Sequence, residues 1–353
     1  MGDTVCVVVP DPVGEGCSLQ SYRADTGEYK CTLKIPIKNG TQMTVWRLSW
    51  CPPELGTMLA GTCSDGTVRI WIQRLGAWNE LTCLGGEGKE SCGSWGDVAF
   101  APRHLGLRLA AGGEDGVVRV YSAMSERNLR AWELREEFSL GVDSSVTALS
   151  WCPSQGDAPM MVVANQRSER GAGDIRRSPP RLTIWGLASA GVWTPMLEFL
   201  GANREASHGE IRSVAWAPSF GRSYHYIASA GTCGRLCLWK VTAMEEREIA
   251  AGMALAAKGE SVAALGGDIK DSPAAQVITL KGATLKGSPF PPIDAAHDFD
   301  HINGNPYPIA NLAWNAAGTS LISGARTSIR IWKQNLAGDW ECVEEVERER
   351  KTM

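Results

Sequence analysis

Hydrophobic and polar residues alternate in short runs along this chain, and residues 44–71 show the pattern most clearly. An alternating run stops at a proline pair, and an apolar run follows it. The segment then turns at Asp65-Gly66 and closes with a second alternating run that ends at Trp71. Asp-Gly supplies the positive φ that a tight hairpin needs, and alternation gives each strand one apolar face. The pattern predicts three short antiparallel strands.

The same pattern recurs with a period of about 50 residues. The aromatic residue that closes its last strand is found at Tyr22, Trp71, Tyr121, Trp185, Trp239 and Trp332. Four of these are followed by a glycine, any residue and an aromatic residue, which predicts the start of a fourth, outer strand. Units of four short strands at this period resemble the blades of WD-repeat propellers. We therefore expect an all-β fold, a single six-bladed WD-repeat β-propeller.

The repeat register also predicts the domain organisation. The propeller is expected to span residues 1–346, with a flexible insertion at about 244–292 and a charged tail at 347–353. Its blades are expected at about 1–40, 42–84, 95–140, 145–200, 210–280 and 305–346. The first blade is incomplete, because no innermost strand fits ahead of Val5.

The two ends of the predicted propeller suggest a binding site. The last blade already has four strands, so neither terminus completes the other's blade and the ring stays open between the first and last blades. Unpaired sheet edges invite β-addition by another chain. We expect Val5, Val7 and Val9, with Ile329 and Ile331, to line this gap. The alternative is that these five residues are ordinary core residues. For Ile329 and Ile331 the sequence supports this alternative at least as well as a place at the gap.

Composition narrows the class of protein. The net charge is −4 without a concentrated basic patch, which argues against direct nucleic-acid binding. The 11 cysteines are scattered singly, which favours reduced thiols over a zinc site. The N-terminal apolar run is too short for a signal peptide, and no window reaches the length of a membrane span. We expect a soluble, intracellular protein.

Catalytic chemistry finds little support. The five histidines fall in predicted turns or loops, and no Ser-His-Asp or paired-carboxylate arrangement repeats along the chain. The cluster His297-Asp298-Phe299-Asp300-His301 offers metal-ligand types, but a loop between blades explains it more simply. We expect no enzyme activity, no cofactor and no metal.

One segment departs from the even charge distribution. Residues 167–181 hold five arginines, one glutamate and one aspartate. We expect a long solvated hairpin loop within the fourth blade. The alternative is a regulated docking loop, in which phosphorylated Ser178 pairs with Arg176 and Arg177.

Three segments carry a closer resemblance: Trp46-Arg47-Leu48-Ser49-Trp50, residues 100–121, and Ala217 to His225 with its Phe-Gly-Arg-Ser-Tyr-His run. They resemble the Sec-thirteen-homologue (Seh) nucleoporins, a branch of the WD-repeat propeller family, over about residues 18–240 and 297–346. The resemblance implies a scaffold subunit of the Y-shaped complex of the nuclear pore complex, at the nuclear envelope. It also implies a hetero-oligomer in which an α-solenoid scaffold nucleoporin inserts a β-blade, in support of protein and mRNA transport.

Other assemblies fit the same architecture. Relatives of this kind also join the SEA/GATOR nutrient-signalling complex, which implies the cytoplasm or the surface of the vacuole or lysosome, and a sibling serves a vesicle coat. A peptide-reading propeller is a further alternative, which needs a closed ring and a pocket near its axis. The missing innermost strand of the first blade and the long insertion depart from the family pattern.

Overall fold

The computed structural model describes residues 4–10, 17–23, 25–35, 44–85, 95–125, 128–155, 158–170, 175–177, 180–188, 191–199, 210–232, 234, 236–242, 275–280, 308–326 and 328–347. The chain divides into two compact units, Met1–Val146 and Thr147–Met353. Strands dominate both units, and two short 3₁₀ turns, η1 (Pro53–Leu55) and η3 (Arg103–Leu105), join strands in the first unit. The predicted all-β class is confirmed.

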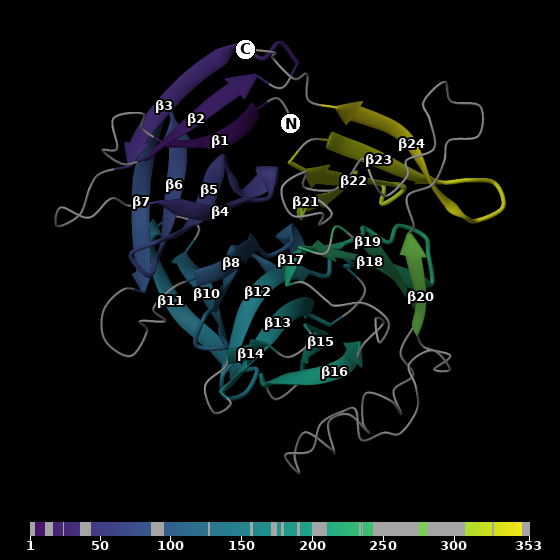
Figure 1. Cartoon of the computed structure of the whole chain (residues 1–353). Helices are drawn as coiled ribbons and strands as arrows, with labels where there is room; N and C mark the ends of the chain where they lie inside the picture. Colours follow the sequence, from purple (N-terminus) through teal and green to yellow (C-terminus); the bar gives the residue numbers. More distant parts are fainter. Residues whose placement is uncertain are drawn as a thin grey trace. The chain divides into compact units, whose positions relative to one another are not determined.

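The first unit holds three antiparallel sheets, coloured purple to blue in Figure 1. Blade one contains β1 (Thr4–Pro10), β2 (Cys17–Arg23) and β3 (Tyr29–Ile35). Blade two contains β4 (Val45–Trp50), β5 (Met58–Cys63), β6 (Thr67–Arg74) and β7 (Ala77–Gly85). Blade three contains β8 (Trp95–Phe100), β9 (Arg108–Gly113), β10 (Val117–Ser125) and β11 (Asn128–Ser139).

The second unit holds three more sheets, and the first strand of blade four begins just before the boundary between the units. Blade four contains β12 (Ser144–Trp151), β13 (Met160–Arg170), β15 (Arg181–Leu187) and β16 (Trp193–Phe199), and β14 (Ile175–Arg177) pairs with β13. Blade five contains β17 (Ile211–Trp216), β18 (Tyr224–Gly231), β19 (Leu236–Thr242) and β20 (Ala275–Leu280). Blade six contains β21 (Ile309–Trp314), β22 (Ser320–Ala325), β23 (Ser328–Gln334) and β24 (Trp340–Glu347).

Six successive sheets therefore correspond to the six predicted blades, and blade one has three strands in the described part of the chain. Outer strands begin at or next to the predicted aromatic residues, at Tyr29, Trp78, Trp193 and Trp340. Within the predicted insertion, β20 supplies the outer strand of blade five, and the rest of residues 244–292 lies outside the described residues.

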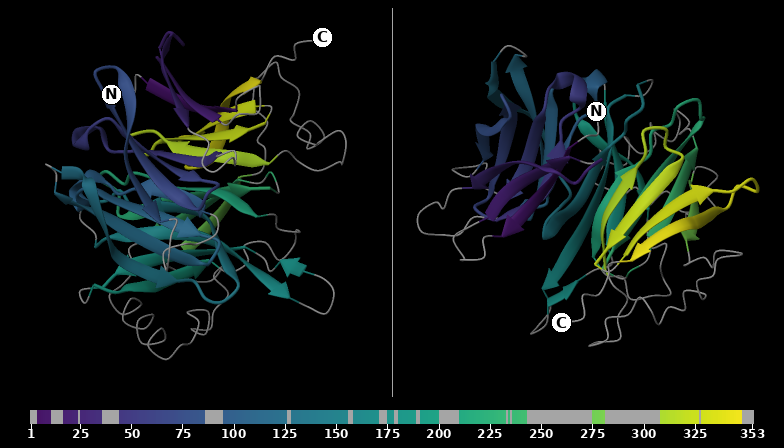
Figure 2. Two further views of the ribbon diagram at one scale, coloured as in Figure 1. Left: turned by 90° about the vertical axis from the view of Figure 1, so that its left-hand side faces the viewer. Right: turned by 90° about the horizontal axis from the view of Figure 1, so that it is seen from above.

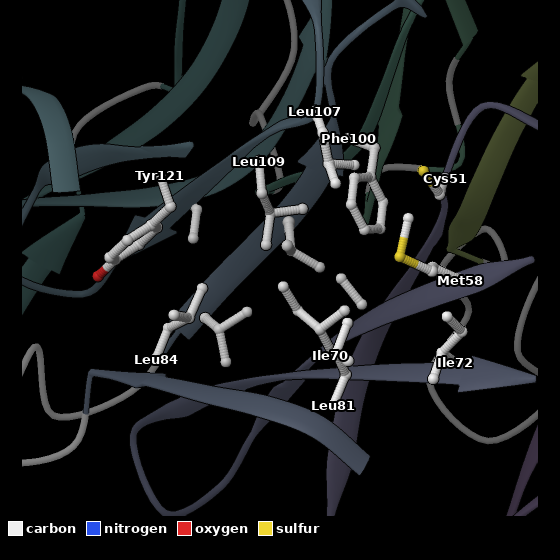
Figure 3. Close-up of a cluster of buried hydrophobic side chains, with 14 residues drawn as sticks. Cys51, Met58, Ile70, Ile72, Leu81, Leu84, Phe100, Leu107, Leu109 and Tyr121 are labelled. Atoms are coloured by element: carbon white, nitrogen blue, oxygen red, sulfur yellow. The ribbon is translucent and has the colours of Figure 1, made fainter. Parts of the chain in front are cut away.

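Neighbouring blades pack through apolar side chains that alternate along each strand. Figure 3 shows the cluster between blades two and three, where Met58 and Ile70 face Phe100, Leu107 and Leu109. Met58, Ile70 and Leu109 are completely buried. The period of two along a strand places alternate residues on one face, so each blade carries one face for each neighbour.

Serine hydroxyls link the innermost strands of neighbouring blades within a unit. The Oγ of Ser49 accepts a hydrogen bond from the Phe100 N–H at 3.0 Å, and Ser150 accepts one from Trp216 at 3.1 Å. Ser213 accepts one from Leu312 at 3.0 Å. Innermost strands pair with only one neighbour in their own sheet, so these hydroxyls satisfy backbone donors that would otherwise be buried without a partner.

Replacing Ser49 with alanine is expected to cost about 1–3 kcal/mol of unfolding free energy, because the N–H of buried Phe100 loses its acceptor. Urea denaturation measures this cost. Ser122→Ala is the control, since the Ser122 hydroxyl makes only a long contact of 3.5 Å with a neighbouring carbonyl. An equal, small loss in both variants would show that the link between the innermost strands contributes nothing.

Hydrogen bonds and ion pairs stabilise the Asp65-Gly66 turn. Asp65 accepts hydrogen bonds from the Thr67 N–H at 3.1 Å and from Arg69 Nη2 at 3.2 Å, and Arg69 Nη1 lies 2.7 Å from Glu80 Oε2. Burial is the largest single influence on the pKa of Asp65 and raises it. The hydrogen bonds from Thr67 and the charge of Arg69 together outweigh burial, so the pKa of Asp65 is lowered.

A pH dependence of stability follows from the lowered pKa of Asp65. A carboxyl whose pKa is lower in the folded chain stabilises it above the unfolded pKa, about 4, and this stabilisation is lost as the pH falls further. The urea midpoint of the wild type is expected to fall more steeply below about pH 4 than that of Asp65→Asn. Parallel curves for the two proteins would contradict this role for Asp65.

The basic segment of blade four differs from the prediction. β13 continues to Arg170 and pairs with β14, with Ser168 opposite Arg177 and Glu169 opposite Arg176. Figure 2 shows this ribbon, in teal, extending past the rest of its sheet. The two sides of the predicted hairpin loop therefore form strands rather than loop at 168–170 and 175–177, because their backbone groups pair with each other. Ser178 lies outside the described residues, so its phosphorylation stays a prediction.

Candidate protein interface on the first and last blades

The third strands of blades two, four and five each present two apolar side chains to the following blade. In blade two these are Val68 and Ile70, both completely buried, and their cross-strand partners Leu84 and Ala60 are buried with them. The corresponding residues of blades four and five, Leu182 with Ile184 and Leu236 with Leu238, are also buried.

Blade six carries the same positions but leaves them exposed. Ile329 and Ile331 correspond to Val68 and Ile70, because in both blades the pairing shifts just before the closing tryptophan. Ile322 pairs with Ile331, and Val346 pairs with Ile329, so the four side chains share one face of the sheet. Ile322, Ile329 and Val346 are 39%, 49% and 52% exposed, and Ile331 is half-buried. We call these four residues the blade-six face.

Blade one exposes the side of its sheet that points away from blade two. Its Cys6, Val8 and Leu19 pack against Leu59 and Trp71 of blade two. Its other side, which we call the blade-one face, consists of Val5, Val7, Val9, Tyr22 and Tyr29. Val5, Val7 and Tyr29 are exposed, while Val9 and Tyr22 are half-buried.

Polar contacts hold the aromatic residues of the blade-one face. The hydroxyl of Tyr22 donates to Gln20 Oε1, and the hydroxyls of Tyr29 and Thr32 are 2.6 Å apart. The two tyrosine rings meet edge to face with centroids 5.9 Å apart. Tyrosines with fixed rings offer apolar area at a low cost in side-chain entropy, as is common in protein interfaces.

The five residues expected at the gap thus lie on these two faces. Val5, Val7 and Ile329 are exposed, and Val9 and Ile331 are half-buried. Sequence reasoning missed Tyr22, Tyr29, Ile322 and Val346. The strand pairing contained a signal for them, since Tyr22, Ile322 and Val346 are cross-strand neighbours of chosen residues and Tyr29 is the cross-strand neighbour of Tyr22.

Other candidate chemistry is structural where the structure describes it. Cys51, Cys152 and Cys237 are buried and form no disulfide, and burial, with a smaller effect of Glu54, raises the pKa of the Cys51 thiol to about 12. His225 contacts the Trp216 indole, which donates to its Nδ1 at 3.3 Å. In the described segments, no group of three or more His, Cys, Asp or Glu residues is placed to hold a metal. The cluster at 297–301 lies outside them.

Within the described residues, no helix combines the length and the apolar character that crossing a membrane requires.

Comparison with known proteins agrees with the repeat pattern. The family described as WD domain, G-beta repeat, matches residues 31–71. Nucleoporin SEH1 of Saccharomyces cerevisiae is 29% identical over 313 residues, which cover 84% of this chain and 81% of the relative. Nucleoporin SEH1 of Bos taurus and that of Homo sapiens are each 27% identical over 340 residues, which cover 91% of this chain and 77% of each relative.

These matches extend over far more of the chain than the three segments that first suggested them. The resemblance to Seh nucleoporins is confirmed, and so is the six-bladed fold. This chain is a six-bladed β-propeller that matches the WD-repeat family over residues 31–71 and is similar to the SEH1 nucleoporins along most of its length.

Proposed function

We propose that this chain is a non-enzymatic scaffold subunit of the nuclear pore, and that the Y-shaped complex at the nuclear envelope is its assembly. The names of its relatives support the nucleoporin role. The Y-shaped complex and the α-solenoid partner follow from the resemblance to Seh nucleoporins. In this role the chain contributes binding surfaces rather than chemistry.

The exposed blade-six face is the observation that carries the proposal. Ile322, Ile329 and Val346 are exposed to solvent, although the equivalent side chains of other blades pack against a following sheet. A contiguous apolar surface of this kind marks a binding site. Burying an aliphatic side chain that was fully exposed stabilises a complex by about 1.5–3 kcal/mol. The gain is smaller for these three side chains, because they are already about half-buried in the free chain. The partner that fits is a β-sheet with an apolar face.

The blade-one face fits the same partner. Val5 and Val7 supply aliphatic area, and Tyr22 and Tyr29 supply fixed rings with hydroxyls at their rim. We propose that β-strands inserted by an α-solenoid nucleoporin cover both faces, which makes the functional form a hetero-oligomer. Sheet-on-sheet packing would then continue the arrangement that the chain uses between its own blades.

Affinity purification of the tagged chain from nuclear and cytosolic fractions tests the proposal. Recovery of α-solenoid nucleoporins in stoichiometric amounts from the nuclear fraction is the expected result. Recovery of SEA/GATOR or vesicle-coat subunits alone would keep the architecture and move the function to the cytoplasm or the vacuole or lysosome surface. Absence of any stoichiometric partner would contradict the scaffold role and favour a peptide-reading propeller.

A further inference from the structure

One hairpin of blade two carries a residue that suits neither its backbone nor its surroundings. Leu75 and Gly76 form the two-residue loop between paired Arg74 and Ala77, and both have positive φ, 51° and 78°. Such a loop favours asparagine or glycine at its first position, because a larger L-residue is strained there. The Leu75 side chain is also fully exposed to water. Leucine therefore harms both the conformation and the solvation of this turn, which points to a function other than folding.

The neighbouring hairpin of blade three has a second exposed apolar tip. Met124 lies near the end of β10, next to the paired residues Ser125 and Asn128, and is 63% exposed. In a four-stranded antiparallel sheet, the first and third connections lie at the same end. Leu75 and η1 therefore lie at one end of blade two, and Met124 and η3 lie at one end of blade three.

Contacts between these two blades show that the two ends adjoin. Arg103 Nη1 in η3 lies 3.9 Å from Glu54 Oε1 in η1. The serine hydrogen bond described above also links β4 and β8 close to the same ends. Leu75 and Met124 therefore project from one end of the first unit, each from a different hairpin.

Positive charge accompanies the two tips. Arg74, Arg103 and Arg130 are exposed, and Arg130 lies two residues after the start of β11. The four segments that make up this end hold four arginines and two glutamates, a net charge of +2, in residues 52–57, 73–77, 102–107 and 123–130. The whole chain has the opposite sign, with a net charge of −4. This end is therefore both apolar at its tips and locally basic.

The opposite end of the same blades has the opposite character. The turns there carry exposed carboxylates at Asp65, Asp115 and Asp143. β7 ends and β8 begins at this acidic end, so the link between blades two and three also starts and finishes there, away from the apolar tips. A negatively charged surface would therefore attract the end that carries Leu75 and Met124 and repel the other.

From these observations we infer that blades two and three bind an anionic lipid bilayer through a tip surface, which consists of Leu75, Met124, Arg74, Arg103 and Arg130. The two apolar side chains enter the boundary between headgroups and acyl chains, and the guanidinium groups bind the lipid phosphates. A bilayer fits better than a protein pocket, because separate tips on two hairpins need only reach one level and require no complementary shape. The inference goes beyond the proposed function, since it uses neither of the two exposed faces.

Flotation of the full-length chain with lipid vesicles tests the inference. The chain is expected to bind vesicles of phosphatidylcholine with phosphatidylserine about tenfold more tightly than vesicles of phosphatidylcholine alone. Added salt is expected to reduce this difference, because it screens the arginines. Methionine oxidation reports the contact directly. Hydrogen peroxide is expected to oxidise Met124 in the free chain faster than buried Met58, and vesicles with phosphatidylserine are expected to slow the oxidation of Met124.

Leu75→Asn separates binding from folding. Asparagine adopts positive φ more readily than leucine, so the melting temperature is expected to stay the same or rise, whereas vesicle binding is expected to weaken about tenfold. Val142→Asn is the matched control, because Val142 is 79% exposed at the acidic end, and it is expected to leave vesicle binding unchanged. Replacing Arg74 and Arg130 together with glutamine is expected to weaken binding to vesicles with phosphatidylserine by about 10- to 30-fold.

Three results would overturn the inference. One is equal vesicle binding by the wild type and Leu75→Asn, or no binding by either. Another is oxidation of Met124 in the free chain as slow as that of Met58, which would mean that other residues of this chain cover the tips. The third is a protein that co-purifies with the wild type but not with Leu75→Asn while vesicle binding persists, which would assign the tips to a protein partner. Recovery of nucleoporins through the two exposed faces does not depend on Leu75, so failure of the tip surface is distinguishable from failure of the proposed function.

Discussion

Ile329→Asp is expected to weaken binding of the scaffold partner by about 100-fold, while the melting temperature of the isolated chain changes little. The side chain is 49% exposed, so the free chain tolerates the charge. In the complex the carboxylate would be buried among apolar side chains without a partner, which costs several kcal/mol, and 100-fold corresponds to about 2.7 kcal/mol. Titration calorimetry with the partner and thermal melts of the free chain measure the two effects.

The same substitution at the equivalent buried position is the control. Val68→Asp places a carboxylate at a fully buried site between blades two and three and is expected to unfold the chain. Aspartate at Val5 or Val7 is expected to behave like Ile329→Asp, with loss of binding greater than loss of stability. Equal losses of stability at Ile329 and Val68 would mean that Ile329 is an ordinary core residue.

Trp71→Ala is expected to lower the free energy of unfolding by about 3–5 kcal/mol, which is the upper end of the range for truncating a buried side chain. Trp71 is 1% exposed and packs with Leu59 and Leu19, and a Cβ added at Gly61 would lie only 2.8 Å from its ring. The indole thus fills a space that no neighbour can occupy without a shift of the backbone. Urea denaturation followed by circular dichroism measures the loss.

Tyr22→Ala is the matched control, because Tyr22 closes the third strand of blade one as Trp71 closes that of blade two. Tyr22 is half-buried on an exposed face, so its truncation is expected to cost clearly less, about 1–2 kcal/mol. A loss at Tyr22 as large as that at Trp71 would show that the blade-one face is packed in the free chain.

The repeat register was the part of the fold that the sequence could predict. Closing aromatic residues, Asp-Gly turns and the glycine-aromatic marker each reflect a local requirement of a strand or turn, so they identify strands without knowledge of contacts. The structure has its outer strands at the predicted markers, for example at Trp78 and Trp193, and even β20 lies where an apolar run interrupts the insertion.

Burial could not be predicted in the same way. Val68-Arg69-Ile70-Trp71 and Ile329-Arg330-Ile331-Trp332 have nearly the same pattern, yet Val68 is fully buried and Ile329 is half exposed. The difference arises from what packs on each sheet, and alternation within a strand carries no record of that neighbour. The β13–β14 ribbon was missed for a related reason, because its pairing extends beyond the sheet whose pattern predicted the strands.

Hydroxyl-radical labelling of the side chains of the blade-six face, in the free chain and in the complex with its scaffold partner, tests the central claim most directly. The account predicts that Ile322, Ile329 and Val346 are labelled in the free chain and protected at least several-fold in the complex, while exposed Leu75 in blade two is labelled equally in both. Unchanged labelling of Ile329 and Val346 in a stoichiometric complex would contradict it, because the partner would then bind elsewhere.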